Sequence, residues 1–361
     1  MAEPMTEREW AVPFLVDVRL TLAVQGRGRG DPTFRADEAG AIWRTSLTPD
    51  GPATIRVLPS RPPVRAGGLT EPPGRVTARA DDLSEPPAAV SEPPAAVTLV
   101  RAQSWGPGAA WLLDALPGAL GRDDDASGFA ADAHPVIRDA ARRHPGLRIG
   151  RSCRLMEALV PAILEQKVVV LEAHRAWRIL LAKYGTQPPG PAPRGMRVFP
   201  DPGTWRRIPS WEWHRAGVEG VRAETIIRAA SVADSLERLL TLSHEEADRK
   251  LRTIPGIGVW TSAEARQRAA GDPDAVSVGD YHLKNVVGWA LAGRDRSTDE
   301  DMLALLEPFK GHRHRATRLI GLSRGTGATR AAGSGAGLAR YGTGGPPRRG
   351  PRMSVRDYRG F

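Results

Sequence analysis

A glycine-containing turn lies between two predicted helices in the second half of the chain. The residues Pro255-Gly256-Ile257-Gly258 end one predicted helix and permit a tight turn with positive φ, and Thr261 with Glu264 marks the start of the next helix. Such a turn leaves backbone N–H groups pointing outward at a helix N-terminus, where a nucleic-acid phosphate can bind without any basic side chain. The turn is therefore a candidate phosphate-binding site, and a plain helix-ending turn is the alternative.

A carboxylate follows this turn about twenty residues later. Asp280 ends the short run Val276-Ser277-Val278-Gly279 and opens the next predicted helix. As an N-cap, its side chain would accept hydrogen bonds from the backbone N–H groups of His282 or Leu283. Capping and catalysis are compatible roles for one carboxylate, so Asp280 is a candidate for both.

The elements that must position these residues fall into a strand-rich part and a helical part. Residues 13–102 alternate apolar with polar side chains in short pieces, which indicates an antiparallel sheet with one solvent-exposed face. The pieces are PFLVDVRLTLAV, AIWRTSLT, ATIRVLP, RVTARA and AAVTLVRA. From about Trp111 onward the apolar spacing predicts helices over 110–120, 135–143, 154–184, 211–216, 223–239, 244–253, 259–270, 282–291, 299–306 and 314–322.

These patterns predict an α+β protein of three segments. Residues 1–105 form an N-terminal antiparallel β-rich α/β domain, 106–323 an all-α domain, and 324–361 a disordered basic tail rich in Gly and Arg. The tail has eight Arg and ten Gly against one acidic residue, Asp357, so it contributes +7 of the net charge of +10. The heptad SEPPAAV occurs twice in succession over 84–97, which indicates an expanded loop.

Composition excludes several classes of protein. Among 361 residues, 41% are hydrophobic, and no run approaches the roughly 20 apolar residues of a membrane span. The N-terminal MAEPMTEREW is not a signal peptide, so we expect a soluble cytoplasmic protein without membrane association. Cys153 is the only cysteine, which excludes an internal disulfide, a Cys-ligated zinc and an iron–sulfur cluster held by four cysteines. Outside the tail the charge is nearly balanced and says little about nucleic acid.

The segment from Leu251 to Lys284 resembles a known family. The pattern L-x-x-I-P-G-I-G-x-W-T-x-A-E followed by V-G-D-Y-H-L-K is similar to the helix-hairpin-helix base-excision DNA glycosylases, specifically the DNA-3-methyladenine glycosylase II type. Residues 154–185 resemble the helix pair before the family's hairpin, and 308–313 resemble the motif before its last core helix. Residues 13–102 would correspond to the family's N-terminal mixed α/β domain.

The resemblance implies an enzyme that flips a damaged base out of the duplex and hydrolyses its N-glycosidic bond. Asp280 matches the family's catalytic aspartate, which stabilises positive charge on the sugar and orients or deprotonates water. Trp260 stands where strand-cutting members have a Schiff-base lysine, so we expect a monofunctional enzyme for alkylated bases. The implied base pocket holds Trp260, Glu264 and Tyr281, and the implied DNA contacts are Gln166, Lys167, Gly256, Ile257, Gly258, Val259 and Thr261.

Three positions depart from the family pattern. Lys167 replaces an apolar residue that fills the gap left by the flipped base, so Val168 or another residue would take that place. Glu264 replaces an aromatic residue, and either it favours a cationic alkylated base or it forms a capping box near Thr261. No tryptophan follows Pro308, so one aromatic wall of the family's pocket is missing and the substrate range stays open.

Other patterns receive plainer interpretations. The run 312–315 predicts a solvated basic face or a DNA-backbone contact in preference to a metal site, and the tryptophans around Pro209 predict packing. Residues 222–228 form an amphipathic helix to which we assign no role. We expect a monomer that binds damaged double-stranded DNA and requires no cofactor, although hairpin carbonyls in the family often hold a monovalent cation. The alternatives are a non-catalytic DNA-binding or lesion-sensing protein and a glycosylase for oxidised or deaminated bases.

Overall fold

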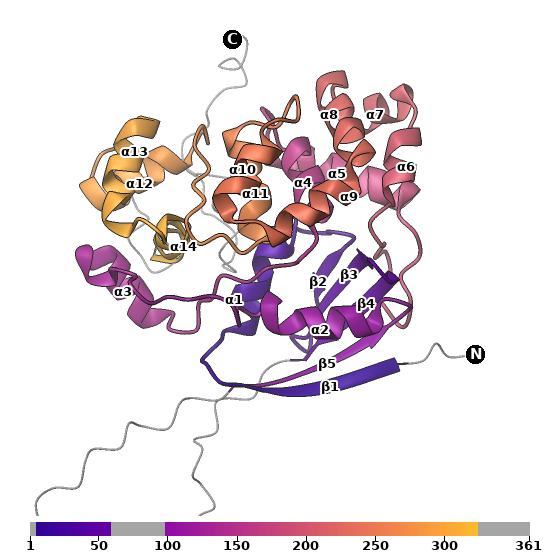
Figure 1. Cartoon of the computed structure of the whole chain (residues 1–361), viewed down its shortest axis with the longest axis horizontal. Helices are drawn as coiled ribbons and strands as arrows, with labels where there is room; N and C mark the ends of the chain where they lie inside the picture. The colour runs from indigo at the N-terminus through magenta and orange to yellow at the C-terminus, as the bar shows by residue number, and fades with distance from the viewer. Residues whose placement is uncertain (1–4, 59–97, 324–361) are drawn as a thin grey trace, which may run out of the picture.

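A five-stranded antiparallel sheet forms the first part of the fold, in the order β1-β5-β4-β3-β2 (Figure 1). The computed structural model describes residues 5–58 and 98–323. The strands are β1 Met5–Val12, β2 Phe34–Ala36, β3 Ile42–Thr48, β4 Gly51–Val57 and β5 Thr98–Trp105. A two-residue loop joins β3 to β4, and Thr48 pairs with Gly51, whose φ of 118° favours glycine. The expected α+β composition is thus present.

One expected strand is wrong and one strand was not foreseen. The segment 13–24 contains the helix α1 Val18–Leu22 and the 3₁₀ helix η1 Ala23–Gln25 instead of a strand. Asp17 caps α1 by accepting a hydrogen bond from the Leu20 N–H at 2.8 Å, and this local bond favours the helix over the strand. The strand β1 lies upstream of the region in which strands were expected. The RVTARA segment, the SEPPAAV repeats and the C-terminal tail lie outside the described residues.

The remaining described residues are mostly helical. The helices are α2 Ala109–Ala119, η2 Ala131–Ala133, α3 Pro135–Arg143, α4 Leu155–Leu164, α5 Val170–Tyr184, α6 Pro202–Arg207, α7 Ser210–Ala216, α8 Gly220–Ser231, α9 Ala233–Arg238, η3 Leu239–Thr241, α10 His244–Leu251, α11 Val259–Ala269, α12 Leu283–Ala292, α13 Asp299–Leu306, η4 Glu307–Phe309 and α14 Arg313–Ser323. The predicted helical regions are confirmed, with two of them each forming two helices. The region 154–184 is interrupted at 165–169, and the region 223–239 is interrupted at 232. The helix α6 was not predicted. None of these helices, within the described part of the chain, has the length and apolarity to cross a bilayer.

In Figure 1, α10 and α11 lie between two groups of helices. On one side are α12, α13 and α14 with α3, and on the other are α4 to α9. The helix α2 packs against β1, β4 and β5, and α11 packs against α4. The pair α10 and α11 is therefore the junction between the two helical groups.

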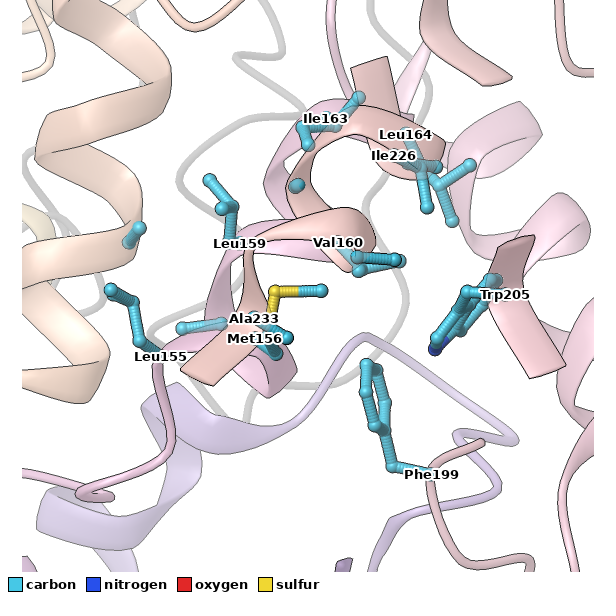
Figure 2. Close-up of a cluster of buried hydrophobic side chains, with 14 of the residues drawn as sticks. Leu155, Met156, Leu159, Val160, Ile163, Leu164, Phe199, Trp205, Ile226 and Ala233 are labelled. Atoms are coloured by element: carbon cyan, nitrogen blue, oxygen red, sulfur yellow. The ribbon is translucent and has the colours of Figure 1, made fainter. Parts of the chain in front are cut away.

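The helix α4 is the centre of the largest hydrophobic core. Of its ten residues only Glu157 is not buried, and the others contact side chains from α5, α8, α9 and α11 (Figure 2). The Trp205 ring is fully buried and stacks on Trp213 at 5.9 Å between centroids. Trp211 is 65% exposed, so the packing expected for the tryptophan cluster is confirmed for two of its three members. The loop that follows α4 thus extends from a rigid element.

The predicted basic face at 312–315 is wrong, because His314 and Arg315 are buried and Arg313 is held in an ion pair. Arg315 is buried in an ion pair with Asp124, and Arg313 pairs with Asp274 at 2.5 Å. Burial works against ionisation of Asp274, yet the hydrogen bonds and charge of Arg313 hold the pKa of this carboxyl below its ordinary value. Burial, reinforced by three neighbouring arginines, lowers the pKa of His314 well below its ordinary range. These residues stabilise the fold.

Candidate active site

The turn between α10 and α11 has the predicted hairpin form. Gly256 has a φ of 93°, as expected, and a Cβ added there would lie 2.2 Å from Thr225 Oγ1. The positive φ expected at Gly258 is wrong, since this residue has φ −95° and ψ −176° and is the N-cap of α11. Nothing lies within 4 Å of an added Cβ at Gly258, so glycine leaves an open surface there. The turn therefore requires glycine at 256, and glycine at 258 leaves the outer side of the turn free of side-chain atoms.

The N-terminus of α11 presents backbone donors at the surface. The first helical hydrogen bond at this end runs from the Ser262 N–H to the Gly258 carbonyl at 3.0 Å. The N–H groups of the first turn therefore have no acceptor within the helix. Gly256, Gly258 and Val259 are exposed, whereas the side chain of Ile257 is buried in the main core. Of the expected contacts in the hairpin, Ile257 and Thr261 can contribute only their backbone, since the Thr261 side chain is also buried and its hydroxyl accepts from Gln166.

The loop after α4 is hydrogen-bonded to this hairpin. Gln166 Nε2 donates to the Gly256 carbonyl at 2.9 Å and to Thr261 Oγ1 at 2.8 Å. The next residue, Lys167, is exposed and has a φ of 52°, a conformation that L-residues rarely adopt. Val168 packs against the main core, so its side chain does not point outward as a wedge would. The structure thus brings Gln166, Lys167 and the hairpin together on one surface.

The helix α8, to which the sequence analysis assigned no role, contacts both the hairpin and the end of α4. Arg222 is buried and donates to the Leu164 carbonyl at 2.9 Å, at the end of α4. Thr225 fills the space beside Gly256, and Arg228 Nη1 lies 3.5 Å from the Pro255 carbonyl. The amphipathic spacing of these residues predicts a helix, but it does not reveal which carbonyls the arginines reach.

Asp280 lies next to the start of α11, and its carboxylate is held by three donors. Oδ1 accepts hydrogen bonds from the backbone N–H groups of His282 and Leu283 at 2.8 and 2.9 Å, as predicted. The predicted N-cap is wrong by two residues, since α12 begins at Leu283 and its N-cap is His282. Oδ2 accepts from the indole Nε1 of Trp260 at 3.2 Å. Tyr281, the next residue, is 67% exposed and meets the His282 ring edge-on at 4.8 Å. The structure therefore joins Asp280, Trp260 and Tyr281 at one place.

Glu264 differs from both sequence-based expectations. The helix begins at Val259 and is capped by Gly258, so the predicted capping box of Thr261 and Glu264 is wrong. The Glu264 side chain is buried, accepting from Ser277 Oγ at 2.7 Å and from Arg268 Nη1 at 2.8 Å. Because Arg268 compensates its charge inside the protein, Glu264 is not the uncompensated acid envisaged for a cationic base.

No group of three or more His, Cys, Asp or Glu side chains in the described ranges has an arrangement that could hold a metal ion. A cavity of about 410 Å³ is lined by residues including Val16, Arg143 and His144, and it contains none of the site residues. What the site can supply chemically is a carboxylate of fixed orientation beside a helix N-terminus with unpaired N–H groups.

Comparison with known proteins relates this chain to DNA-3-methyladenine glycosylases. No family model matches the sequence. A curated *Mycobacterium tuberculosis* protein described as "Probable bifunctional transcriptional activator/DNA repair enzyme AlkA" is 30% identical over 167 residues, which is 46% of this chain and 33% of that protein. A *Bacillus subtilis* DNA-3-methyladenine glycosylase is 24% identical over 201 residues, which is 54% of this chain and 66% of that protein. The chain thus matches about a third of the first relative's length and just under two thirds of the second's.

Solved structures share the fold over most of the chain. A 3-methyladenine DNA-glycosylase from Archaeoglobus fulgidus superposes with a TM-score of 0.64 at 15% identity, covering 87% of this chain and 96% of that one. An 8-oxoguanine glycosylase/lyase from Clostridium acetobutylicum gives 0.58 at 11% identity, covering 90% and 100%. The fold is that of the helix-hairpin-helix glycosylases, and the resemblance seen in the sequence is confirmed.

Proposed function

We propose that this chain is a monofunctional DNA glycosylase that flips alkylated, 3-methyladenine-like bases out of the duplex and hydrolyses their N-glycosidic bond in base-excision repair. The observation that carries the proposal is the Asp280 carboxylate, which is fixed by three donors, one of them the indole of Trp260 in the first turn of α11. A protein that only bound DNA would gain nothing from a carboxylate there, because it repels phosphates.

The chemistry follows from the charge that develops as a base departs. Cleavage of the N-glycosidic bond leaves positive charge on the deoxyribose, and a nearby carboxylate lowers the energy of that state without moving. The three hydrogen bonds orient the Asp280 oxygens before substrate arrives, so little reorganisation is needed in the transition state. The same carboxylate is in reach of the surface to orient or deprotonate the water that completes hydrolysis.

The proposed DNA face is made by the hairpin and the loop after α4. The N–H groups at the start of α11 would bind a backbone phosphate, and Gly258 allows the duplex to approach the backbone closely. Lys167 is exposed beside them and would add a phosphate or groove contact.

We expect the chain to act on damaged double-stranded DNA as a monomer in the cytoplasm. Its two domains would be the sheet-bearing segment 1–105 and the helical segment 106–323.

No cofactor enters this proposal. Two of the hairpin carbonyls already face side-chain donors, since Gln166 binds the Gly256 carbonyl and Arg228 approaches the Pro255 carbonyl. The Arg228 guanidinium beside the turn would also repel a cation bound there. A monovalent cation on the hairpin would therefore use other backbone carbonyls, and no step of the proposed reaction requires one.

The proposal is tested by incubating purified protein with alkylated duplex DNA and identifying the released bases by chromatography. We expect release of 3-methyladenine and related bases and none from the undamaged duplex. Tight binding to the alkylated duplex without any released base would favour a lesion-sensing protein and would refute the proposal.

The product should be an intact strand with an abasic site, because Trp260 occupies the position at which a lysine would form a Schiff base. Borohydride should therefore trap no covalent complex, and strand breaks should appear only after alkali. Denaturing gels with and without both treatments measure this.

Trp260→Lys is the matched control, since it places an amine beside Asp280 and should produce a trapped complex. Efficient trapping by the unchanged protein would contradict the monofunctional assignment.

A further inference from the structure

One face of α11 is attached to the segment that leads to Asp280. Trp260, Glu264 and Gln267 follow one another at helical spacing, four and three residues apart, so their side chains lie on one side of the helix. Trp260 binds Asp280, Glu264 binds Ser277 Oγ, and Gln267 Nε2 donates to Ser277 Oγ at 3.0 Å and to the Ala275 carbonyl at 2.9 Å. Three residues of the segment 275–280 are thus hydrogen-bonded to one side of α11.

We propose that Glu264 is a positioning residue that acts through Ser277 to aim the Asp280 carboxylate. This inference rests on the proposed glycosylase function, and it assigns Glu264 a role other than reading the base. It follows from the burial of Glu264 and Ser277, which are 6% and 3% exposed, and from the 2.7 Å hydrogen bond between them.

The connection from Ser277 to Asp280 is a tight turn. The Asp280 N–H donates to the Ser277 carbonyl at 3.1 Å, and Gly279 has a φ of 87°, the combination found in type II turns. In such a turn the position of the first residue determines the position of the fourth. A shift of Ser277 would therefore move Asp280 relative to its Trp260 and backbone donors.

The other end of this network is anchored deep in the protein. Arg268 binds Glu264 Oε2 at 2.8 Å, and Arg268 Nε donates to the Val24 carbonyl at 3.2 Å. Gln25 Nε2 in turn donates to the Arg268 carbonyl at 3.2 Å. Glu264 is therefore held between the Arg268 guanidinium and Ser277, the first residue of the turn. This arrangement suits Glu264 to fix the position of the turn, and it does not suit Glu264 to bind a charged ligand.

The test uses Glu264→Gln and Ser277→Ala, with Asp124→Asn as the matched control. The control also weakens a buried carboxylate–arginine pair, with Arg315, but it has no contact with the 275–280 segment. Single-turnover release of 7-methylguanine, which is cationic, and of hypoxanthine, which is neutral, is measured at saturating protein, together with duplex affinity and the thermal midpoint.

We expect Glu264→Gln and Ser277→Ala to lower the rate constant about 10-fold on both substrates, because small displacements of a catalytic group have effects of this order or larger. Duplex affinity should change by less than about twofold, since neither side chain lies in the proposed DNA face. Asp124→Asn should lower the thermal midpoint and leave the rate constant unchanged at a temperature at which all variants are folded.

A loss of rate on 7-methylguanine alone would show that Glu264 reads the base. An equal loss of rate in Asp124→Asn would show a purely structural role. Either result overturns the proposal.

Hydrogen exchange of the 276–283 backbone keeps the inference separate from the proposed function. Both test variants should exchange this segment faster than the unchanged protein, and the control should not. If the unchanged protein releases no base, the proposed function fails. Unchanged exchange in both test variants would refute the positioning role, whatever the activity.

Discussion

Asp280→Asn should lower the rate of base release by about 10²-fold or more, while the affinity for damaged duplex is kept or improves. In the proposed reaction the carboxylate stabilises the positive charge that develops on the sugar, and an amide cannot neutralise that charge. Removing the negative charge also removes its repulsion of the DNA phosphates, so binding should not suffer. Single-turnover base release and duplex titration measure the two quantities separately.

The hydrogen bonds around Asp280 define the necessary control. An asparagine whose oxygen accepts from the His282 and Leu283 N–H groups would direct its NH₂ group at the Trp260 indole N–H, so two donors would face each other. The double variant Asp280→Asn with Trp260→Phe removes that conflict while the charge stays absent. If activity stays low in the double variant and is kept in Trp260→Phe alone, the loss is due to charge. Full turnover in the folded Asp280→Asn protein would remove this residue from the mechanism.

Gly256→Ala should destabilise the protein by about 2–5 kcal/mol and weaken duplex binding. A left-handed conformation costs an L-residue about 1–2 kcal/mol, and forcing a methyl group into a packed region typically costs about 1–3 kcal/mol more. The obstacle is Thr225, which is fully buried and whose hydroxyl donates to the Val221 carbonyl at 2.8 Å. Chemical denaturation and duplex titration measure both effects.

Two variants separate the causes of that loss. Thr225→Ala in the Gly256→Ala background should recover the part of the stability due to the clash and leave the part due to the positive φ. Gly258→Ala should cost less than about 1 kcal/mol, since its backbone is extended and an added Cβ meets nothing, yet it should weaken duplex binding. If Gly258→Ala binds duplex as well as the unchanged protein, the hairpin backbone does not approach the phosphates closely.

Features set by neighbouring residues were predictable from sequence. The helices around the turn, the positive φ of Gly256 and the hydrogen bonds of Asp280 to the His282 and Leu283 N–H groups all depend on contacts a few residues apart. The alternation of apolar and polar residues at 13–24 predicted a strand, and this was wrong. Asp17 caps a helix there, and the buried residues of that helix follow helical spacing. Glu264 and Arg315 were misjudged for a different reason. Ser277 and Asp124, which bind Glu264 and Arg315, are 13 and 191 residues away, and no local pattern reveals such a partner. Arg268, the other partner of Glu264, lies four residues further along the same helix, and the sequence does show that spacing.

The two hydrogen bonds of Gln166 have a consequence for how a duplex would be searched. They fix the separation between the exposed Lys167 and the donor-rich start of α11, so both contacts would meet the duplex in one register. A surface assembled in advance loses little conformational entropy at each encounter, and it needs no rearrangement before it tests a nucleotide. We therefore expect the protein to test successive base pairs of a duplex at one fixed distance from the backbone phosphate that it binds.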